Sequence, residues 1–524
     1  MKHALPPLND RHVLVLGLGA SGLAMARWCA LAGARVTVAD TRPTPPQAAP
    51  LMQEWPSARI VCSAFDAALW ASAPWAMVCR SPGIAPAQMQ DVLAAARAVG
   101  VPVVGELSLF AQALRALAAP ARQAEPEPQA DHPVPYRPVV LAITGTNGKT
   151  TTTALTAHLL REAGWSVGLA GNIGPTLLDE LRQALATGEL PQAWVLELSS
   201  FQLDGVEDFE PTAATVLNLS QDHLDWHGSM AAYAEAKRRV FGRTALMVLN
   251  RDDEIVMGWQ PSPVTVREGG RTRTEPGRPF VTFGTDGPRR PGDWGLETVN
   301  GMTWLVRALP QDDTRRKGRT ATDEEEVYLQ RLMPAEALRI RGRHNASNAL
   351  AALALATAAG APLAPMLHGL REYRGEPHRV EPVAIVRDVE YIDDSKGTNV
   401  GATLAAINGL GAERRLVVIL GGDGKGQDFA PLAPAVARHV RAVALIGRDA
   451  AALRAVLAPT GVPMTDCASL PEAVRWCATQ AQPGDAVLLS PACASLDMFR
   501  DYAHRAAVFV ETVRELQQAE GTPA

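Results

Sequence analysis

Short apolar runs alternate with helical patterns along the first hundred residues of the chain. The runs HVLVL (12–16) and VTVAD (36–40) predict two strands, and a glycine turn between them leads into a helix. The helix is indicated by residues spaced three and four positions apart, namely Leu23, Ala26, Arg27, Ala30 and Leu31. Further strands are expected at 58–62, 75–84 and 101–106. This strand–helix order predicts a small Rossmann-like domain.

A second α/β pattern begins at residue 139. Strands are expected at 139–144, 193–199, 213–219 and 245–250, and a long helix at 344–360. Residues 260–335 are richer in Gly, Pro and Arg, and contain short β patterns at 279–284 and 303–309. Two segments lack an apolar period, the Pro-, Ala- and acid-rich stretch 118–138 and the polar run 311–326. We expect an exposed flexible insertion at the first and a mobile loop at the second.

A third α/β pattern fills the last 150 residues, with strands expected at 389–394, 415–422, 442–447 and 485–492 and helices at 432–440 and 470–481. The predicted fold class is therefore α/β, with three consecutive domains. We place a Rossmann-like domain at 1–105, a P-loop-type central domain at 106–374 and a Rossmann-like C-terminal domain at 375–524. Flexible insertions are expected in the central domain near 118–138 and 310–328.

Composition narrows the class of protein. The 524 residues carry a net charge of −5, which argues against nucleic-acid binding, and the basic runs near 271–278 and 314–319 are expected to be solvated loops. The six cysteines form no C-x-x-C pair, which is typical of a reducing compartment. The first residues lack a signal-peptide pattern, and we find no apolar run long enough to span a bilayer. We therefore expect a soluble, cytoplasmic protein.

Two glycine loops follow strands and open helices. The first contains Gly17, Gly19 and Gly22, and Asp40 ends the next strand. Taken alone, this pattern suggests an NAD-type cofactor, but the same geometry accepts any nucleotide diphosphate, and a packing turn without ligand is also possible.

The second loop, TGTNGKTT at 144–151, is more specific. Gly145 lies only three positions before Gly148, closer than in the usual P-loop. Its backbone amides can still cradle phosphate, while Lys149 neutralises charge and Thr150 offers a hydroxyl to Mg²⁺. Glu197, at the end of a strand, is a candidate metal ligand. By residue type alone, His223 would be a hydrogen-bonding or core residue, with Asp222 and Asp225 as alternative ligands.

Several motifs occur in an order that resembles the Mur ligases, the ATP-dependent amide ligases of peptidoglycan synthesis. They are TGTNGKTT, AGNIG, LELSSFQL, DHLDWHG, YAEAKRRVF, HNASNALAALA, PHRVE, DDSKGTN, GGDGKGQDF and LSPACASLDMF. The similarity covers nearly all of the chain apart from 118–138 and 260–335. It implies three domains, which bind a UDP-sugar, ATP and an amino acid in that order. It also implies a role in cell-wall biogenesis, and with it in cell shape and division.

The resemblance further implies a reaction. ATP would phosphorylate the carboxylate of UDP-N-acetylmuramoyl-L-alanine, and the amine of D-glutamate would displace phosphate from the acyl phosphate. Phosphorylation gives a poorly electrophilic carboxylate a good leaving group, so the protein mainly positions reactants and neutralises charge. Mg²⁺ is the implied cofactor and ATP the co-substrate. We expect no nucleic-acid partner, no membrane span and a monomer.

Residue roles are carried over from the matching motifs. Catalytic roles fall on Lys149, His223, Lys237 and Glu197. The implied metal ligands are Thr150, Glu197, His223 and Lys237, the last only if CO₂ has converted it to an anionic carbamate. ATP contacts are implied for Gly145, Thr146, Asn147, Gly148, Lys149, Thr150, Thr151, Asn345, Asn348, Arg379, Asp394 and Lys396. UDP-sugar contacts are implied for Gly19, Ala20, Ser21, Gly22, Asp40, Thr41, Arg42, Ser81, Gly83 and Asn172. D-Glutamate contacts are implied for Thr398, Lys425, Ser495, Leu496 and Tyr502, where the family often has phenylalanine at the last position.

Other functions account for less of the sequence. Another Mur-type ligase with a different amino acid shares the ATP motifs, but its D-N-P, DYGHHP-like or DCYNANP-like segments are not found. An NAD-dependent dehydrogenase would explain loop 17–22 and leave the motifs at 145–150, 344–348 and 421–425 without a purpose. A non-catalytic nucleotide sensor is the remaining alternative, and a requirement for two further substrates would separate it from a ligase.

Overall fold

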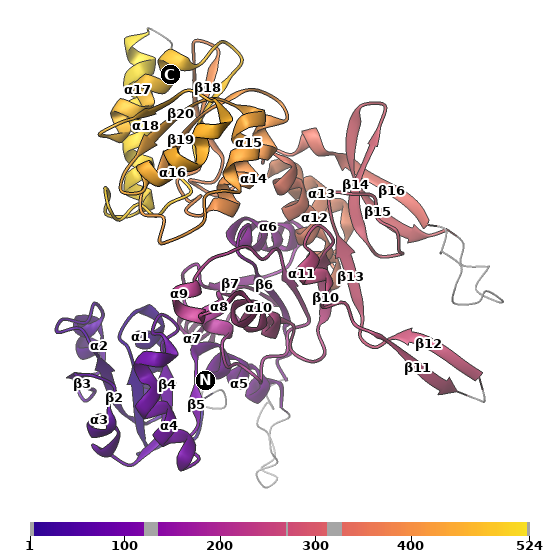
Figure 1. Cartoon of the computed structure of the whole chain (residues 1–524). Coiled ribbons are helices and arrows are strands. Elements are labelled where there is room, and N and C mark those ends of the chain that lie inside the picture. Colours follow the sequence, from indigo (N-terminus) through magenta and orange to yellow (C-terminus); the bar gives the residue numbers. More distant parts are fainter. Residues whose placement is uncertain (1–4, 120–134, 269–270, 312–326, 521–524) are drawn as a thin grey trace.

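The computed structural model describes residues 5–119, 135–268, 271–311 and 327–520. Three α/β domains follow one another along the chain, each built on its own sheet (Figure 1). This confirms the predicted fold class. The predicted flexibility of 120–134 and 312–326 concerns residues outside the described parts of the chain. None of the helices in the described parts is long and apolar enough to cross a membrane.

The first domain has a five-stranded parallel sheet in the order β3-β2-β1-β4-β5. Its strands are β1 (His12–Leu16), β2 (Arg35–Asp40), β3 (Arg59–Cys62), β4 (Trp75–Arg80) and β5 (Val103–Val104). Its helices are α1 (Ala20–Leu31), α2 (Ala48–Glu54), α3 (Ala67–Ala71) and α4 (Gln90–Ala98), and α5 (Glu106–Ala118) leads into the central domain. The strand order is that of a Rossmann fold without its sixth strand, which confirms the predicted Rossmann-like domain.

The residues whose spacing indicated helix α1 coincide only partly with its buried residues. Met25, Trp28 and Cys29 are fully buried, whereas Arg27 forms ion pairs with Glu54 and Asp179. The reason is that α1 lies between the sheet of its own domain and helices α5 and α7 (Leu177–Thr187). A helix covered on two sides does not show one apolar stripe.

The central domain contains a nine-stranded sheet in the order β16-β15-β14-β13-β10-β9-β6-β8-β7. The strands are β6 (Val139–Thr144), β7 (Val167–Gly171), β8 (Ala193–Glu197), β9 (Ala213–Val216), β10 (Leu246–Asn250), β13 (Phe280–Phe283), β14 (Trp294–Val299), β15 (Met302–Pro310) and β16 (Val327–Pro334). Strands β6 to β13 in this sheet are parallel, and β14, β15 and β16 pair antiparallel. A separate hairpin, β11 (Pro263–Glu268) and β12 (Arg271–Pro276), projects from the domain (Figure 1).

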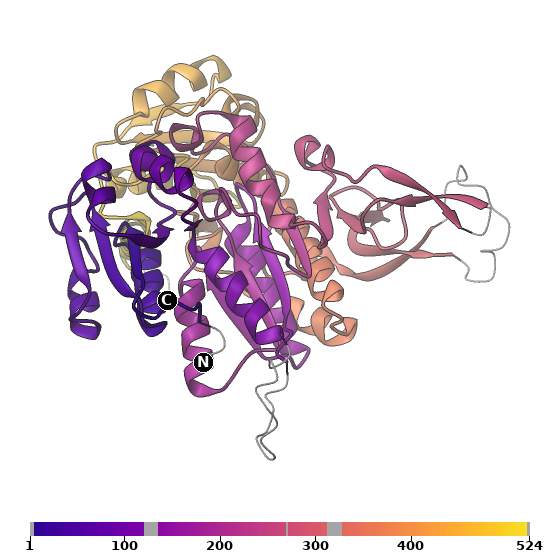
Figure 2. The same cartoon turned by 90° about the horizontal axis from the view of Figure 1, so that it is seen from below.

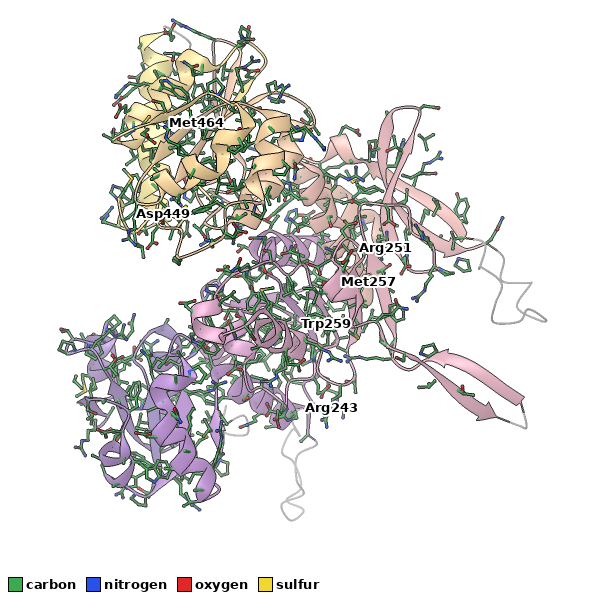
Figure 3. The ribbon with its side chains drawn as sticks, viewed as in Figure 1. Arg243, Arg251, Met257, Trp259, Asp449 and Met464 are labelled. Carbon is green, nitrogen blue, oxygen red and sulfur yellow. The ribbon has the colours of Figure 1, made fainter. Side chains whose placement is uncertain are left out.

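The helices of the central domain are α6 (Lys149–Glu162), α7, α8 (Ser200–Leu203), α9 (Leu224–His227), α10 (Met230–Arg238), α11 (Glu254–Met257), α12 (Arg343–Ala358) and α13 (Leu363–Glu372). Arg251 joins the parallel and antiparallel parts of the sheet. It follows β10, and its guanidinium donates to the hydroxyl of Thr282 at 2.6 Å and to the carbonyl of Trp294 at 2.9 Å (Figure 3).

The prediction of an exposed flexible insertion at 118–138 is wrong for the C-terminal end of that segment. The hydroxyl of Tyr136 donates to the carbonyl of Pro191 at 2.6 Å and accepts from the indole of Trp194 at 2.9 Å. Trp194 is fully buried and packs edge-on against Phe110 of α5. One apolar core therefore runs from the first domain into the central domain without a break, and the two lie against each other in both views (Figure 2).

The C-terminal domain has a six-stranded sheet in the order β17-β18-β22-β19-β20-β21. Its strands are β17 (Glu381–Val386), β18 (Val389–Asp393), β19 (Leu416–Gly421), β20 (Val440–Ile446), β21 (Met464–Asp466) and β22 (Ala486–Leu489). Its helices are α14 (Val400–Gly411), α15 (Leu432–His439), α16 (Ala450–Leu457), α17 (Leu470–Gln480) and α18 (Tyr502–Ala519). The sheet is parallel except for β17, which pairs antiparallel with β18 at the edge.

Candidate nucleotide and substrate site

The second glycine loop joins the end of β6 to the start of α6, as predicted. Gly148 precedes α6 with a φ of +81°, and a Cβ on it would lie 2.6 Å from Oδ1 of Asn348. Both facts require glycine, since other residues are strained at this φ and would displace Asn348. The loop thus leaves the free amides at the N-terminus of α6 available to an anion, which is the usual arrangement for phosphate.

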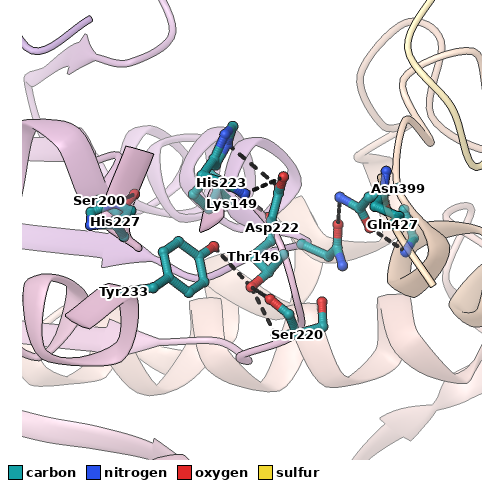
Figure 4. Close-up of polar contacts among 12 residues, drawn as sticks. Thr146, Lys149, Ser200, Ser220, Asp222, His223, His227, Tyr233, Asn399 and Gln427 are labelled. Carbon is teal, nitrogen blue, oxygen red and sulfur yellow. Dashed lines mark hydrogen bonds and ion pairs between the residues drawn. The ribbon is translucent and has the colours of Figure 1, made fainter. Parts of the chain in front are cut away.

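Asn218 holds this loop from the neighbouring strand end. Its Oδ1 accepts from the amide of Asn147 at 2.8 Å, and its Nδ2 donates to the carbonyl of Asn147 at 3.1 Å. The hydroxyl of Thr146 lies 3.0 Å from that of Tyr233 and accepts from the amide of Ser220 at 3.0 Å (Figure 4). Thr146 therefore fixes the loop with its side chain. Asn218 was missed as a site residue, although it lies near the end of the strand predicted at 213–219.

Two lysines lie beneath the loop. Nζ of Lys149 donates to the carbonyls of Gly145 and Thr146 at 2.9 and 2.7 Å. Lys237, on α10, is 2% exposed, and its Nζ donates to the carbonyl of Gly145 at 2.8 Å and to the hydroxyl of Thr144 at 3.2 Å. Burial lowers the pKa of Lys149, and burial together with the charge of Lys149 lowers the pKa of Lys237 well below its ordinary value. Lys237 is thus a solvent-shielded amine whose surroundings disfavour its charged form.

Glu197 ends β8 beside the loop and is 1% exposed. Its Oε1 accepts from Nδ2 of Asn172 at 2.7 Å, and the amide of Asn172 donates to the carbonyl of Glu197 at 2.8 Å. Its Oε2 is buried and has no hydrogen-bond partner among the described residues. A buried carboxylate oxygen without a donor is costly, so this atom fits a cation that would complete its surroundings.

His223 lies on the same side of the loop, at the start of α9. Its backbone has a φ of +53°, its ring packs against Phe201 at 4.7 Å, and its Nε2 is 3.5 Å from a carboxylate oxygen of Asp222 (Figure 4). Burial lowers the pKa of His223, and the charges of Lys149 and Lys237 add to this effect. The ring therefore favours its neutral form, in which one nitrogen can accept a proton or bind a metal.

The C-terminal domain reaches the loop at two points. A guanidinium nitrogen of Arg379 donates to the hydroxyl of Thr150 at 2.5 Å, and Nδ2 of Asn399 donates to Oδ1 of Asn147 at 3.1 Å. Thr150 can still offer a lone pair to a metal, but a cation there would oppose the charge of Arg379. The predicted role of Thr150 as a metal ligand therefore requires the Arg379 guanidinium to leave the Thr150 hydroxyl and pair with an anion.

Three more residues predicted to contact ATP, namely Asn345, Asn348 and Asp394, already form hydrogen bonds within the protein. Asn345 and Asn348, on α12, are buried and hydrogen-bonded to each other at 3.1 Å, next to Gly148. Asp394 is also buried, and its Oδ2 accepts from the hydroxyl of Ser490 at 2.7 Å. Burial raises the pKa of Asp394 to about 7. The predicted contact of Asp394 with ATP would need its carboxyl to exchange the hydroxyl of Ser490 for the nucleotide.

The predicted D-glutamate residues all belong to the C-terminal domain, and two of them, Lys425 and Tyr502, are linked to residues of the nucleotide site. Nζ of Lys396 lies 3.6 Å above the ring of Tyr502, so a residue expected on the ATP side meets one expected on the amino-acid side. Lys425 is exposed, and its charge is close enough to His223 to lower the pKa of that histidine. The loop before Lys425 is held by Asp449, which accepts from the amide of Gly424 at 2.6 Å (Figure 3). Ser495 is buried, whereas Leu496 is 69% exposed.

The loop of the first domain is built around Asp40. One carboxylate oxygen accepts from the amide of Leu18 at 2.7 Å, and Arg42 forms an ion pair with the carboxylate at 2.6 Å. The Arg42 guanidinium lowers the pKa of Asp40 to about 2. A Cβ on Gly22 would lie 2.0 Å from the carbonyl of Gly17, whereas one on Gly19 would meet nothing within 4 Å. Gly22 is thus needed for packing, and the space at Gly19 is free for a ligand.

Comparison with known proteins agrees with this architecture. Residues 11–105 match the model of the MurD-like N-terminal domain of Mur ligases, 143–272 the Mur ligase middle domain and 378–493 the Mur ligase glutamate ligase domain. The chain is 60% identical over 516 residues to a UDP-N-acetylmuramoylalanine–D-glutamate ligase of Albidiferax ferrireducens, with 98% of each chain covered. It is 55% identical over 519 residues to the protein of the same name in Burkholderia mallei, covering 97% of this chain and 98% of that one.

The chain belongs to the Mur ligase family. Solved members share its fold: UDP-N-acetylmuramate-alanine ligase MurC of Thermotoga maritima aligns with a TM-score of 0.52 at 20% identity, covering 96% of this chain and 99% of that chain. MurF of Acinetobacter baumannii aligns with a TM-score of 0.55 at 16% identity, covering 95% and 93%. This Mur ligase is thus an enzyme with three domains in the family's order.

The Mur ligase fold brings most of the predicted residues into two groups. The first surrounds loop 145–150 and contains Lys149, Asn172, Glu197, His223, Lys237, Asn348 and Arg379, with Lys396 and Tyr502 on the C-terminal side. The second surrounds loop 17–22 with Asp40, Arg42 and Ser81, whose hydroxyl donates to the carbonyl of Gly17 at 3.0 Å. The ligand contacts expected of these residues stay predictions, as do those of Ala20, Thr41, Gly83, Thr151 and Thr398.

Proposed function

We propose that this Mur ligase uses ATP to join D-glutamate to UDP-N-acetylmuramoyl-L-alanine in the synthesis of peptidoglycan precursors. The observation that carries the proposal is the 60% identity, over 98% of both chains, to a relative named for that reaction. Two family members, one named as a UDP-N-acetylmuramate-alanine ligase and one as a D-alanyl-D-alanyl ligase, align at only 20% and 15% identity. The assignment of D-glutamate as the amino acid therefore rests on these relatives, whereas the steps of the reaction are argued from the geometry of the site.

The proposed reaction begins at loop 145–150. The terminal phosphate of ATP would lie against the loop amides and Lys149, facing the substrate carboxylate near Asn172. A carboxylate oxygen attacks the γ-phosphorus, the bond to the β–γ bridging oxygen breaks, and ADP leaves. The D-glutamate amine then attacks the acyl carbon, loses a proton and expels phosphate. Lys149 and Arg379 neutralise the charge that builds up on the phosphoryl oxygens.

Magnesium fits this site because Oε2 of Glu197 is buried without a donor and neutral His223 lies nearby. Glu197 and Thr150 would hold one ion, and His223 would help to hold a second. When bound, such ions neutralise phosphate charge and orient the phosphates. The chain itself excludes water, since Glu197 and Lys237 are both almost fully buried.

Lys237 suits the proposed carbamate. Its lone pair would attack CO₂ to form an N–C bond, and the nitrogen would release a proton, which leaves an anionic carbamate. The low pKa of the buried amine favours the unprotonated form that this step needs. The resulting negative charge would lie beside Lys149 and could serve the second metal ion.

In the C-terminal domain, Lys425 would neutralise a carboxylate of D-glutamate, with Thr398, Ser495, Leu496 and Tyr502 around the amino acid. All six cysteines are free, which fits the reducing cytoplasm where we place the enzyme. The expected monomer stays a prediction.

The experiment that tests the function is an ADP-release assay with purified protein. We expect ADP only when ATP, UDP-N-acetylmuramoyl-L-alanine and D-glutamate are all present. ADP release that is independent of the last two compounds would contradict the proposal and favour a simple nucleotidase.

A further inference from the structure

Glu106 is a buried carboxylic acid to which the proposed chemistry gives no role. It is the first residue of α5 and is 2% exposed. Its Oε1 accepts from the amide of Leu178 at 3.0 Å, and its Oε2 is buried without a hydrogen-bond partner among the described residues. Burying a carboxyl group without a full set of hydrogen bonds costs folding free energy, which suggests that the contacts of Glu106 serve a purpose.

The first contact is with the N-terminus of α7. The N-cap residue Thr176 makes no capping hydrogen bond with its own side chain, because its hydroxyl is 3.0 Å from a carboxylate oxygen of Asp179. Glu106 supplies the missing acceptor from a different helix. A carboxylate is also favoured there because the free amides give the helix N-terminus a partial positive charge.

The second contact is with the glycine loop of the first domain. Ser21, in the first turn of α1, lies close enough to Glu106 for its side chain to lower the pKa of that carboxyl. Arg27, on the same helix, forms an ion pair with Asp179 of α7 at 3.1 Å. Burial raises the pKa of Glu106 to about 7, although Ser21 and the amides of Leu178 and Leu177 partly oppose this effect.

The loop 172–176, which precedes α7, connects the contacts of Glu106 to the nucleotide site. Residues 172–176 run from β7 to α7, and Asn172 in this loop makes two hydrogen bonds with Glu197, through its amide and its side chain. The loop is closed by a hydrogen bond from the amide of Gly171 to the carbonyl of Pro175 at 2.9 Å. A shift of the α7 N-terminus would therefore move Asn172 relative to Glu197.

We propose that Glu106 is a positioning residue that sets the spacing between loop 17–22 and Asn172. This spacing favours a substrate that is long enough to contact both loop 17–22 and Asn172. This inference rests on the proposed function, in which the UDP end lies at loop 17–22 and the muramyl end at Asn172. A ligand that fills only the UDP end does not need this spacing, whereas the complete UDP-sugar peptide does.

The test compares UDP with UDP-N-acetylmuramoyl-L-alanine as ligands, using titration calorimetry on the full chain. For Glu106→Ala we expect the dissociation constant for UDP to change less than about threefold. We expect the dissociation constant for the complete substrate to rise at least about tenfold, which corresponds roughly to the loss of one hydrogen bond to a charged group. Glu106→Gln keeps an acceptor for the Leu178 amide and should stay within about threefold of wild type for both ligands.

Controls separate spacing from general damage. Glu180→Ala removes a carboxylate from the same turn of α7, where no hydrogen bond to Glu106 or Ser21 is present in the described structure, and should bind both ligands like wild type. If Glu106→Ala does not fold, Glu106→Asp provides the same comparison, because a side chain one methylene shorter cannot keep both contacts. Equal losses for UDP and the complete substrate, or no loss for either, would overturn the proposal. Failure of wild type itself to bind the complete substrate would contradict the proposed function instead.

Discussion

Arg379 of the C-terminal domain donates a hydrogen bond to the hydroxyl of Thr150 in the phosphate loop of the central domain, at 2.5 Å. Arg379 lies between His378 and Val380, whose φ values are +63° and +49°. A β-branched residue is strained in this region, so surrounding contacts must hold this segment in place. Among them, the Nδ1 of His378 lies 2.8 Å from a carboxylate oxygen of Asp393, which is fully buried.

This relationship predicts that Arg379 links the C-terminal domain to ATP. Arg379→Ala should raise the KM for ATP about tenfold or more, because a hydrogen bond to a charged group is worth about 1.5–3 kcal/mol. Arg379→Lys should recover only part of this, since the ammonium lacks the planar fork of donors. Steady-state kinetics with ATP varied would measure both. An unchanged KM for ATP in Arg379→Ala would refute the link.

Lys149 is expected to be essential for turnover and unnecessary for the UDP end of the substrate. Lys149→Ala should reduce ADP release by at least about a thousandfold, because it removes the charge nearest the transferred phosphate. Binding of UDP-N-acetylmuramoyl-L-alanine should persist, because Lys149 is bonded to the central loop and not to loop 17–22. Full activity in this variant would contradict the proposed role.

Lys425 is expected to select the amino acid. Lys425→Ala should raise the KM for D-glutamate at least about tenfold while changing the KM for ATP less than about twofold, because an exposed ammonium in the C-terminal domain would face a substrate carboxylate. Arg438→Ala, which removes an exposed cation at the end of α15, is the matched control and should leave both values unchanged. Equal increases for both substrates would exclude the pocket we propose.

Activity should depend on CO₂ through Lys237. In buffer freed of CO₂, wild-type activity should fall several-fold and return when bicarbonate is added, because the buried amine would lose its carbamate. Lys237→Ala should have low activity in both conditions. Mass spectrometry under mild conditions would look for the carbamate directly. Wild-type activity that is insensitive to CO₂ would argue that Lys237 acts as an unmodified amine.

Asp40 should stabilise the fold in a pH-dependent way. Its pKa is about 2 in the folded protein against an ordinary value of 3.8, so its contribution is fully present above about pH 5 and is lost as the pH falls through about 2. The shift corresponds to about 2 kcal/mol. Urea unfolding of wild type and Asp40→Asn should therefore differ by about this amount at pH 7, by about half of it at pH 3, and converge only as the pH falls to about 2. A constant difference across this range would mean that the charge of Asp40 is irrelevant to stability.

Buried parallel strands were the part of the fold that the sequence predicted best. Runs such as VVLAI (139–143) and LVVIL (416–420) are apolar throughout because helices cover both faces of the sheet. Strand β7 (VGLAG) was missed because two of its five residues are glycines, which disfavour strands. Strand β17 was missed although it contains the short apolar run VAIV, because it lies at a sheet edge with most of its residues at least partly exposed and begins with Glu381 and Pro382, which disfavour a strand.

The position of a site residue was predictable where it follows from its own loop. Gly148 and Lys149 lie in one short motif, and in the structure they lie at the start of α6, directly after the strand β6 and its loop. Asn218, Glu106 and Arg505 were missed because their partners are distant in sequence. Arg505, for instance, is fully buried and donates to the carbonyl of Ser395, 110 positions away. Such pairs arise only when the domains pack, and a local pattern does not contain them.

The most direct test of the whole account is to identify the product by mass. Purified protein would be given ATP, Mg²⁺ and UDP-N-acetylmuramoyl-L-alanine with an equimolar mixture of D-glutamate, L-glutamate, L-alanine, L-lysine and meso-diaminopimelate. We predict one new UDP-sugar species, heavier by a glutamate residue, which forms with D-glutamate alone and not with its L-isomer. A product that contains any other amino acid, or release of phosphate without a new UDP-sugar species, would contradict the account.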